Sequence, residues 1–184
     1  MNKDLLNLVD SYPSVDSIAF FGRIAQRKRP EMLVEVAKLL PKDTRLIVQG
    51  PAGYGEEDLY NRITTDLRSY GAIVLEPSEV PDKLVVEAKY FINPSEVEGC
   101  SNALLEAMSR GSIPLVSDIK ENRKVLGDLL PLCSDGAASY IEVLEEIRHS
   151  GREHDLQDAI RSCIFANYSE QSVAHNLVKA LTVF

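Results

Sequence analysis

One short segment concentrates positive charge in a chain that is otherwise acidic. The residues from Gly22 to Arg29 read GRIAQRKR and hold four cationic side chains, whereas the whole chain has a formal net charge of -8. Arginine binds phosphate oxygens through paired hydrogen bonds, and lysine neutralises their charge as a point charge. The segment therefore predicts a phosphate site, and the alternative is an ordinary solvated loop that precedes a helix.

A second segment combines a glycine, two carboxylates and the start of a helix. Residues 93–102 read NPSEVEGCSN and lead directly into an apolar helical pattern from Ala103. A helix N-terminus has free amides and a partial positive charge, so it binds anions, and Gly99 lets a ligand approach the backbone. Glu98 and Glu106 offer carboxylate oxygens, which accept hydrogen bonds from sugar hydroxyls. The alternative for Glu106 is an ordinary solvent-facing helix position.

The sequence lacks the motifs, with their required residue spacing, that indicate several other kinds of site. The segment 50–55 reads GPAGYG and does not match the dinucleotide fingerprint, and neither a P-loop nor a nucleophile elbow is present. The three histidines lie late in the chain and match no zinc pattern, so we expect no metal site. Cys100 begins a helix, where thiol pKa values fall, but no histidine lies in the neighbouring loops to support a nucleophile.

Apolar runs alternate with helical patterns along most of the chain. The runs expected to form strands are 17–21, 45–50, 72–75, 90–92 and 113–116. The helical patterns are those that begin at Pro30, near Leu59, at Pro81 and at Ala103, followed by three around 141–147, 156–164 and 173–181. This order predicts an α/β fold, with a Rossmann-like parallel sheet of about six strands and helices on both faces. In such a sheet, ligands bind beyond the carboxyl ends of the strands, where the strand order reverses.

Length and composition fit one soluble globular domain. The chain has 184 residues, 45% hydrophobic and 26% charged, within the usual size of a single domain. We expect residues 1–16 to be a lead-in and residues 17–184 to form the Rossmann-like domain, including a C-terminal helix. Three widely spaced cysteines, no signal-peptide pattern and no long apolar run favour a cytoplasmic location without a transmembrane segment. The acidic balance argues against nucleic-acid binding.

The combined loops resemble the carboxyl-terminal domain of retaining glycosyltransferases of the GT-B fold, most closely family 4, the glycosyltransferases group 1. The residues that carry the resemblance are Gly22-Arg23 with Lys28, Pro94-Ser95-x-x-Glu98-Gly99, and Asn102-x-x-x-Glu106-Ala107-Met108 with Gly111 and Pro114. The seven residues between Glu98 and Glu106 are typical of that group. The pattern extends from about residue 17 to residue 181.

The resemblance implies a site for a nucleotide-diphosphate sugar that is a donor substrate, not a tightly bound cofactor. The residues that would bind this donor are Gly22, Arg23, Lys28, Gly99, Cys100, Ser101, Asn102 and Glu106. Among them, Arg23 and Lys28 would hold the diphosphate, and Glu106 would accept hydrogen bonds from the ribose. Glu98 would be the catalytic residue and would contact the donor sugar near its reacting carbon. The base would lie against residues 76–84, with UDP, GDP and ADP all open.

The resemblance covers only one half of a two-domain enzyme. The implied activity is transfer of a hexose, with retention, to a glycan or lipid-linked acceptor in polysaccharide biosynthesis, and the acceptor would bind a missing amino-terminal domain. The chain alone would then be inactive, and any peripheral membrane contact would come through the missing half. The loop 118–124 also departs from the family, because Lys120 and Glu121 stand where glycines are common and Lys124 stands where an acid is common.

Two other classes of function remain open at this point. One is a non-catalytic binding or scaffold subunit with a vestigial pocket, which the missing half and the altered loop favour slightly. The other is a sugar-nucleotide epimerase, which also pairs two Rossmann-like halves. The length of the native reading frame distinguishes the enzyme from its alternatives, because a transferase needs about one more domain upstream.

Overall fold

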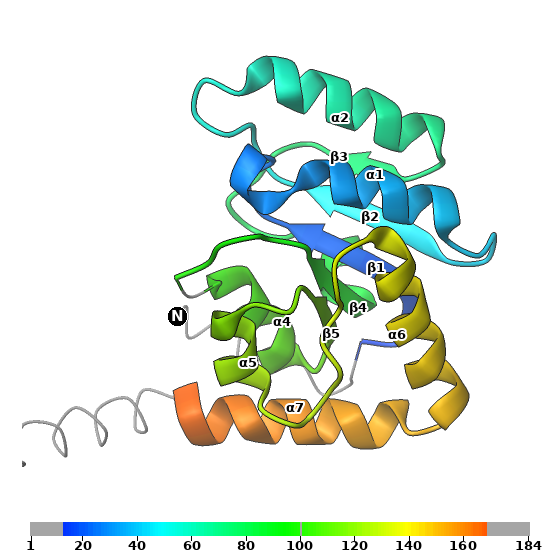
Figure 1. The fold of residues 1–184 in the computed structure, drawn as a ribbon, viewed down its shortest axis with the longest axis vertical. Helices are drawn as coiled ribbons and strands as arrows, with labels where there is room; N and C mark the ends of the chain where they lie inside the picture. The colour runs from blue at the N-terminus through cyan, green and yellow to red at the C-terminus, as the bar shows by residue number, and fades with distance from the viewer. Residues whose placement is uncertain (1–12, 100, 169–184) are drawn as a thin grey trace, which may run out of the picture.

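The computed structural model describes residues 13–99 and 101–168, and these form an α/β fold around one parallel sheet (Figure 1). The strands are β1 (Val15–Phe21), β2 (Arg45–Gln49), β3 (Ile73–Leu75), β4 (Ala88–Asn93) and β5 (Ile113–Val116). Their order is β3-β2-β1-β4-β5, with every neighbouring pair parallel. The sheet therefore has five strands in the described residues, where the sequence pattern predicted about six.

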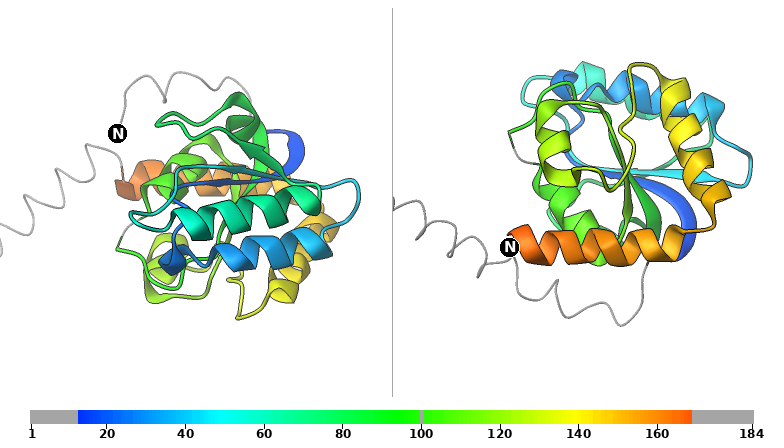
Figure 2. Two further views of the ribbon diagram at one scale, coloured as in Figure 1. Left: turned by 90° about the horizontal axis from the view of Figure 1, so that it is seen from above. Right: turned by 60° about the horizontal axis from the view of Figure 1, so that its bottom comes forward.

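Helices cover both faces of the sheet, as predicted. The elements between and after the strands are η2 (Gln26–Lys28), α1 (Pro30–Leu39), α2 (Glu57–Ser69), α3 (Lys83–Glu87), α4 (Asn102–Arg110), α5 (Lys120–Leu126), α6 (Ala137–Ser150) and α7 (Glu153–Tyr168). On one face, α1 packs between α2 and α6, whereas α3 and the α4–α7 pair cover the other (Figure 2). This arrangement is the doubly wound one that alternating strands and helices favour.

The strands form because their residues are apolar on both faces. In β1, Ile18 and Phe20 enter the large core on the α1 side, whereas Ala19 packs with Ile47 of β2 and Val85 of α3. Burial on both faces explains why these strands read as continuous apolar runs without alternation.

The strand and helix boundaries differ from the predicted ones in a few places. β1 begins at Val15, inside the segment expected to be a lead-in, and Ala88 begins β4, whereas the sequence pattern put it in the preceding helix. The segment read as a loop at 118–124 in fact contains the start of α5, since Lys120 opens that helix. The first part of the lead-in and the helical pattern at 173–181 lie outside the described residues. Across the described residues, no helix has both the length and the apolar character needed to cross a membrane.

Candidate functional site

The strand order reverses between β1 and β4, and both predicted loops lie there. β1 lies between β2 and β4 in the sheet. From β1 the chain continues to β2 on one side, and from β4 it continues to β5 on the other side, so the connections that leave β1 and β4 diverge. The basic segment follows β1 and the Glu98 loop follows β4, so both lie at the carboxyl edge of the sheet (Figure 1). This is the position at which parallel α/β sheets bind ligands.

The carboxyl ends of β1 and β2 approach each other very closely. A Cβ atom built on Gly50 would lie 1.9 Å from the backbone oxygen of Gly22, so only glycine fits at position 50. Gly22 has a φ of 155°, a conformation that side chains disfavour, and its amide donates to the carbonyl of Gln49 at 3.0 Å. The glycine at position 22, predicted as a ligand contact, therefore also has a structural reason.

The basic segment continues into one short turn that positions its cations. Arg27 and Lys28 lie in η2, and Arg29 then adopts a left-handed conformation, with φ 49°, immediately before Pro30 opens α1. A left-handed arginine is strained by about 1 kcal/mol. The amide of Glu96 donates to the carbonyl of Arg27 at 3.2 Å, which ties this turn to the loop after β4.

Lys28 and Glu98 form an ion pair between the two predicted loops. The Lys28 ammonium donates a hydrogen bond to Oε1 of Glu98, and only 13% and 5% of the two side chains are exposed. Nη1 of Arg27 lies 4.0 Å from Oε2 of Glu98. The residues predicted to bind phosphate and sugar therefore meet in one place, although the chain separates them by 70 residues.

The surroundings of Glu98 hold it in its charged form. Burial by itself raises the pKa of Glu98, but the Lys28 ammonium, together with the neighbouring polar side chains of Ser95 and Asn93, lowers it more. The pKa of Glu98 consequently lies below its ordinary value of 4.5. At neutral pH the site therefore contains a buried carboxylate, ready to accept hydrogen bonds from hydroxyl groups.

The N-terminus of α4 supplies donors beside this carboxylate. Ser101 caps the helix, with its hydroxyl accepting from the amide of Leu104 at 3.4 Å. Because this cap occupies only the amide of Leu104, the first two amides of the helix, at Asn102 and Ala103, remain available to a ligand. A Cβ atom on Gly99 would meet nothing within 4 Å, so this stretch of backbone is open to solvent. Cys100 lies outside the described residues.

Glu106 lies one turn into α4 and is half-buried. The buried guanidinium of Arg110, one further turn along, interacts electrostatically with it. Within the part of the chain that the structure describes, Glu106 forms no hydrogen bond or ion pair with Lys28 or Glu98. Its place on the helix that starts at the candidate site is consistent with contact to a more distant part of a ligand.

Arg23 lies apart from the ion pair, in an open depression next to it. The depression has a volume of about 530 Å³, and its lining includes Arg23, Arg27 and Tyr54. Arg23 is exposed, and it forms no ion pair within the part of the chain that the structure describes. The structure therefore brings Lys28 and Glu98 together and leaves the guanidinium of Arg23 available at the rim.

Two side chains at the strand ends also belong to the candidate site, although the sequence analysis did not predict them as site residues. Gln49, which is 4% exposed, accepts from the amide of Asp82 at 2.7 Å and donates to the carbonyl of Glu76 at 3.3 Å. It thereby fixes the loop that was expected to face the base. Asn93 ends β4 and donates to Oε1 of Glu98 at 3.3 Å. A polar residue at the last position of a buried strand is the signal that could have revealed both.

A family model and several curated proteins match the sequence. The model described as "Glycosyl transferases group 1" matches residues 16–147. The O-antigen chain mannosyltransferase B of Escherichia coli is 31% identical over 117 residues, which are 59% of this chain and 30% of that protein. The granule-bound starch synthase 1 of Pisum sativum is 30% identical over 114 residues, 59% of this chain and 18% of that protein. The chain thus spans less than a third of the length of either relative.

Solved structures share the fold at lower identity. HepE of Anabaena in complex with UDP superposes with a TM-score of 0.79 at 12% identity, over 92% of this chain and 49% of that chain. The C-terminal domain of the glycosyl transferase group 1 family protein LpcC from Francisella tularensis gives a TM-score of 0.67 at 16% identity. That match covers 86% of this chain and 89% of the LpcC domain, so most of this chain has the fold of that one domain.

Proposed function

Since the chain belongs to the glycosyl transferases group 1 family and has the fold of a carboxyl-terminal GT-B domain, we propose that it is the donor-binding half of a retaining glycosyltransferase. The observation that carries this proposal is the buried Lys28–Glu98 ion pair at the strand-order reversal. A nucleotide-diphosphate sugar presents phosphate charge on one side of its anomeric carbon and hydroxyl groups on the other. A cation and a carboxylate in contact with each other match that boundary.

Each part of the donor has a complementary group at this edge. Lys28 and the exposed guanidinium of Arg23 would neutralise the diphosphate, and the amides that begin α4 would add hydrogen bonds. Glu106 would accept from the ribose hydroxyls, since it lies one turn further along the same helix. The base would lie against the loop that Gln49 fixes, around Glu76 and Asp82.

The chemistry that these groups support is departure of a nucleoside diphosphate from a sugar. Negative charge develops on the leaving phosphate, and pre-positioned cations and amides stabilise that charge in the transition state. Glu98 stays ionised, so it would hold the hydroxyls of a hexose while the bond to its anomeric carbon breaks. A glycan or lipid-linked acceptor would come from an amino-terminal domain, and turnover would need both halves.

Calorimetric titration of the chain with UDP, GDP and ADP, each free and linked to a sugar, tests the proposal. We expect selective binding of one nucleotide, weakened about tenfold or more by Arg23→Ala, because a charged hydrogen bond to phosphate is lost. Glu106→Ala should weaken the same nucleotide to a similar extent.

The matched control is Arg62→Ala, which removes an exposed arginine that pairs with Glu31 between α1 and α2. This variant should bind the nucleotide as the wild type does. Failure of every nucleotide to bind, or equal losses in the Arg23 and Arg62 variants, would contradict a donor site at this edge. A vestigial pocket in a scaffold subunit would then be the better interpretation.

A further inference from the structure

A series of hydrogen-bonded, buried polar residues runs from Glu98 to helix α5, with one link through the backbone carbonyl of Ser95. Its members, which we call the Glu98 support chain, are Asn93, Ser95, Ser117 and Asn122, with exposures of 2%, 0%, 6% and 1%. They come from the carboxyl ends of β4 and β5 and from the first turn of α5. Buried polar groups that are fully paired with one another fix a single arrangement of side chains.

The first part of the support chain orients a donor toward Glu98. The Ser95 hydroxyl donates to Oδ1 of Asn93 at 2.7 Å, and Nδ2 of Asn93 donates to Oε1 of Glu98 at 3.3 Å. An ionised carboxylate only accepts hydrogen bonds, so the amide must turn its nitrogen to Glu98 and its oxygen to Ser95. The Glu98 carboxylate therefore sets which way the Asn93 amide points, and the Ser95 hydroxyl holds the amide oxygen in that orientation.

The second part of the support chain holds Ser95 in place from the neighbouring strand. The Ser117 hydroxyl donates to the backbone oxygen of Ser95 at 2.5 Å. Nδ2 of Asn122 donates to the carbonyl of Ser117 at 2.8 Å and lies 3.5 Å from its hydroxyl oxygen. Because Asn122 supplies the donor, the Ser117 hydroxyl is left to donate its own proton to Ser95.

We propose that Asn93, Ser95, Ser117 and Asn122 are positioning residues for Glu98, so that α5 controls the contact between Glu98 and the donor sugar. This inference rests on the proposed function only for the identity of the group that Glu98 meets. The site itself contains the reason for such support: a lysine is a flexible point charge, and the Lys28 ammonium is the group expected to turn toward phosphate. The support chain then keeps Glu98 in place while Lys28 is shared with the donor.

A titration of the Glu98 carboxyl by NMR, without any ligand, tests the support chain directly. The charged groups that face Glu98 are Lys28 and Arg27, and they are unchanged in variants of the support chain. Asn93→Ala should raise the pKa of Glu98, since the carboxylate loses a hydrogen bond. Asn122→Ala should raise it by a smaller amount, although Asn122 does not touch Glu98.

Gln157→Ala is the matched control. Gln157 is also a buried amide side chain, 5% exposed. It donates to the carbonyl of Pro13 at 2.9 Å, just before the amino-terminal end of β1 and away from the candidate site. Its loss should lower stability about as much as loss of Asn122, while the titration of Glu98 stays as in the wild type. Should Asn122→Ala fail to fold, Ser117→Ala removes the link to Ser95 and leaves the Asn122 hydrogen bond to the Ser117 carbonyl intact.

A second measurement compares the affinities for a nucleotide and for its sugar-linked form. The ratio of the two affinities should fall about tenfold in Asn93→Ala, the effect of one hydrogen bond to a charged group. It should fall about threefold in Asn122→Ala, with the affinity for the free nucleotide unchanged.

The two measurements separate the positioning role from the donor function. If the variants of Asn122 and Ser117 titrate Glu98 as Gln157→Ala does, the support chain is structural only and the proposal is overturned. If these variants shift the titration but no nucleotide binds to the wild type, the proposed donor function fails and the positioning of Glu98 stands.

Discussion

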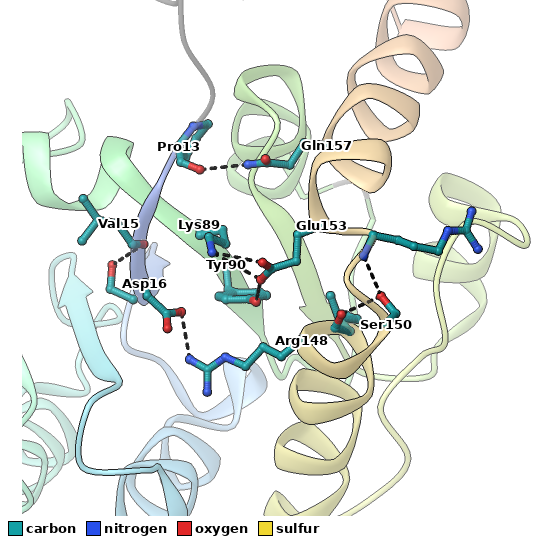
Figure 3. Close-up of polar contacts among 12 residues, drawn as sticks. Pro13, Val15, Asp16, Lys89, Tyr90, Arg148, Ser150, Glu153 and Gln157 are labelled. Atoms are coloured by element: carbon teal, nitrogen blue, oxygen red, sulfur yellow. Dashed lines mark hydrogen bonds and ion pairs between the residues drawn. The ribbon is translucent and has the colours of Figure 1, made fainter.

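The two edges of the sheet both carry ion clusters, but they differ in how completely the groups are paired. At the amino edge, Glu153 at the start of α7 accepts hydrogen bonds from Tyr90 and from Lys89 at the beginning of β4 (Figure 3). Arg148 of α6 reaches Asp16 at 2.8 Å, so the cluster joins the last two described helices to β1 and β4 (Figure 3). Its charges serve to hold elements of the fold together.

The carboxyl edge also carries lysine, arginine and glutamate side chains, but some of its cationic groups and backbone amides remain free to bind a ligand. Lys28 and Glu98 pair with each other, yet the guanidinium of Arg23 forms no ion pair among the described residues, and Arg27 has 60% of its side chain exposed. The first amides of α4 and the open backbone at Gly99 are also available. A ligand can therefore replace water at this edge.

The difference comes from topology more than from composition. At the amino edge, the turn between α6 and α7 lies at the ends of the strands, and burial raises the pKa of Tyr90. Lys89, Tyr90 and Glu153 pair with one another there, whereas Nε of Arg148 is buried without a hydrogen-bond partner among the described residues. At the carboxyl edge, the connections from β1 and β4 diverge. An ion cluster points to a ligand site only where the fold leaves room for the ligand.

The largest expected effect is that of Lys28→Met at the carboxyl edge. Removing the cation leaves Glu98 buried without its main partner, which should reduce the free energy of unfolding by about 3 kcal/mol. Denaturant unfolding measures this loss, and Lys38→Met is the control, because Lys38 forms an exposed pair with Glu35. A loss no greater than that of the control would mean that Arg27 or water fully replaces Lys28.

Glu153→Ala should produce the next largest effect, at the amino edge. Lys89 and Tyr90 lose a shared acceptor, so the free energy of unfolding should fall by about 2 kcal/mol. Nucleotide affinity should stay unchanged, because the cluster lies at the opposite ends of the strands. Glu153→Gln keeps an oxygen acceptor for Tyr90 and should recover part of the loss, whereas weaker nucleotide binding in either variant would contradict the separation of the two edges.

Acid should produce the smallest effect, through Glu98. Its pKa is lower in the folded protein than its ordinary value of 4.5, so the unfolded chain binds the proton first as the pH falls. The stabilisation is therefore complete above about pH 5 and is lost as the pH drops through the folded pKa. The difference in unfolding free energy between the wild type and Glu98→Gln should narrow over this range. A constant difference between pH 7 and pH 3 would show that Glu98 titrates alike in both states.

Much of the fold and part of the site followed from local sequence patterns. The apolar run at 113–116 predicted β5 with its correct bounds, and Pro30 correctly marked the first residue of α1. The segment 118–124 was misread as a loop, because its charged residues hide the few apolar positions, Val125 and Leu126, that anchor α5. The site residues whose signal is a motif, such as Lys28 and Glu98, could be proposed without coordinates.

The sequence by itself determined the alternation of strands and helices along the chain, apart from α5, as well as the glycines at the strand ends and the two loops that carry cations and carboxylates. These features depend on neighbouring residues, whose hydrophobic periodicity and turn preferences act locally. Only the tertiary structure decided that Lys28 pairs with Glu98, and that Asn122 supports Glu98 through Ser117 and Ser95. The Lys28–Glu98 and Ser117–Ser95 contacts join segments far apart in the chain, and they exist because parallel pairing of β1 with β4, and of β4 with β5, brings the strand ends to one edge.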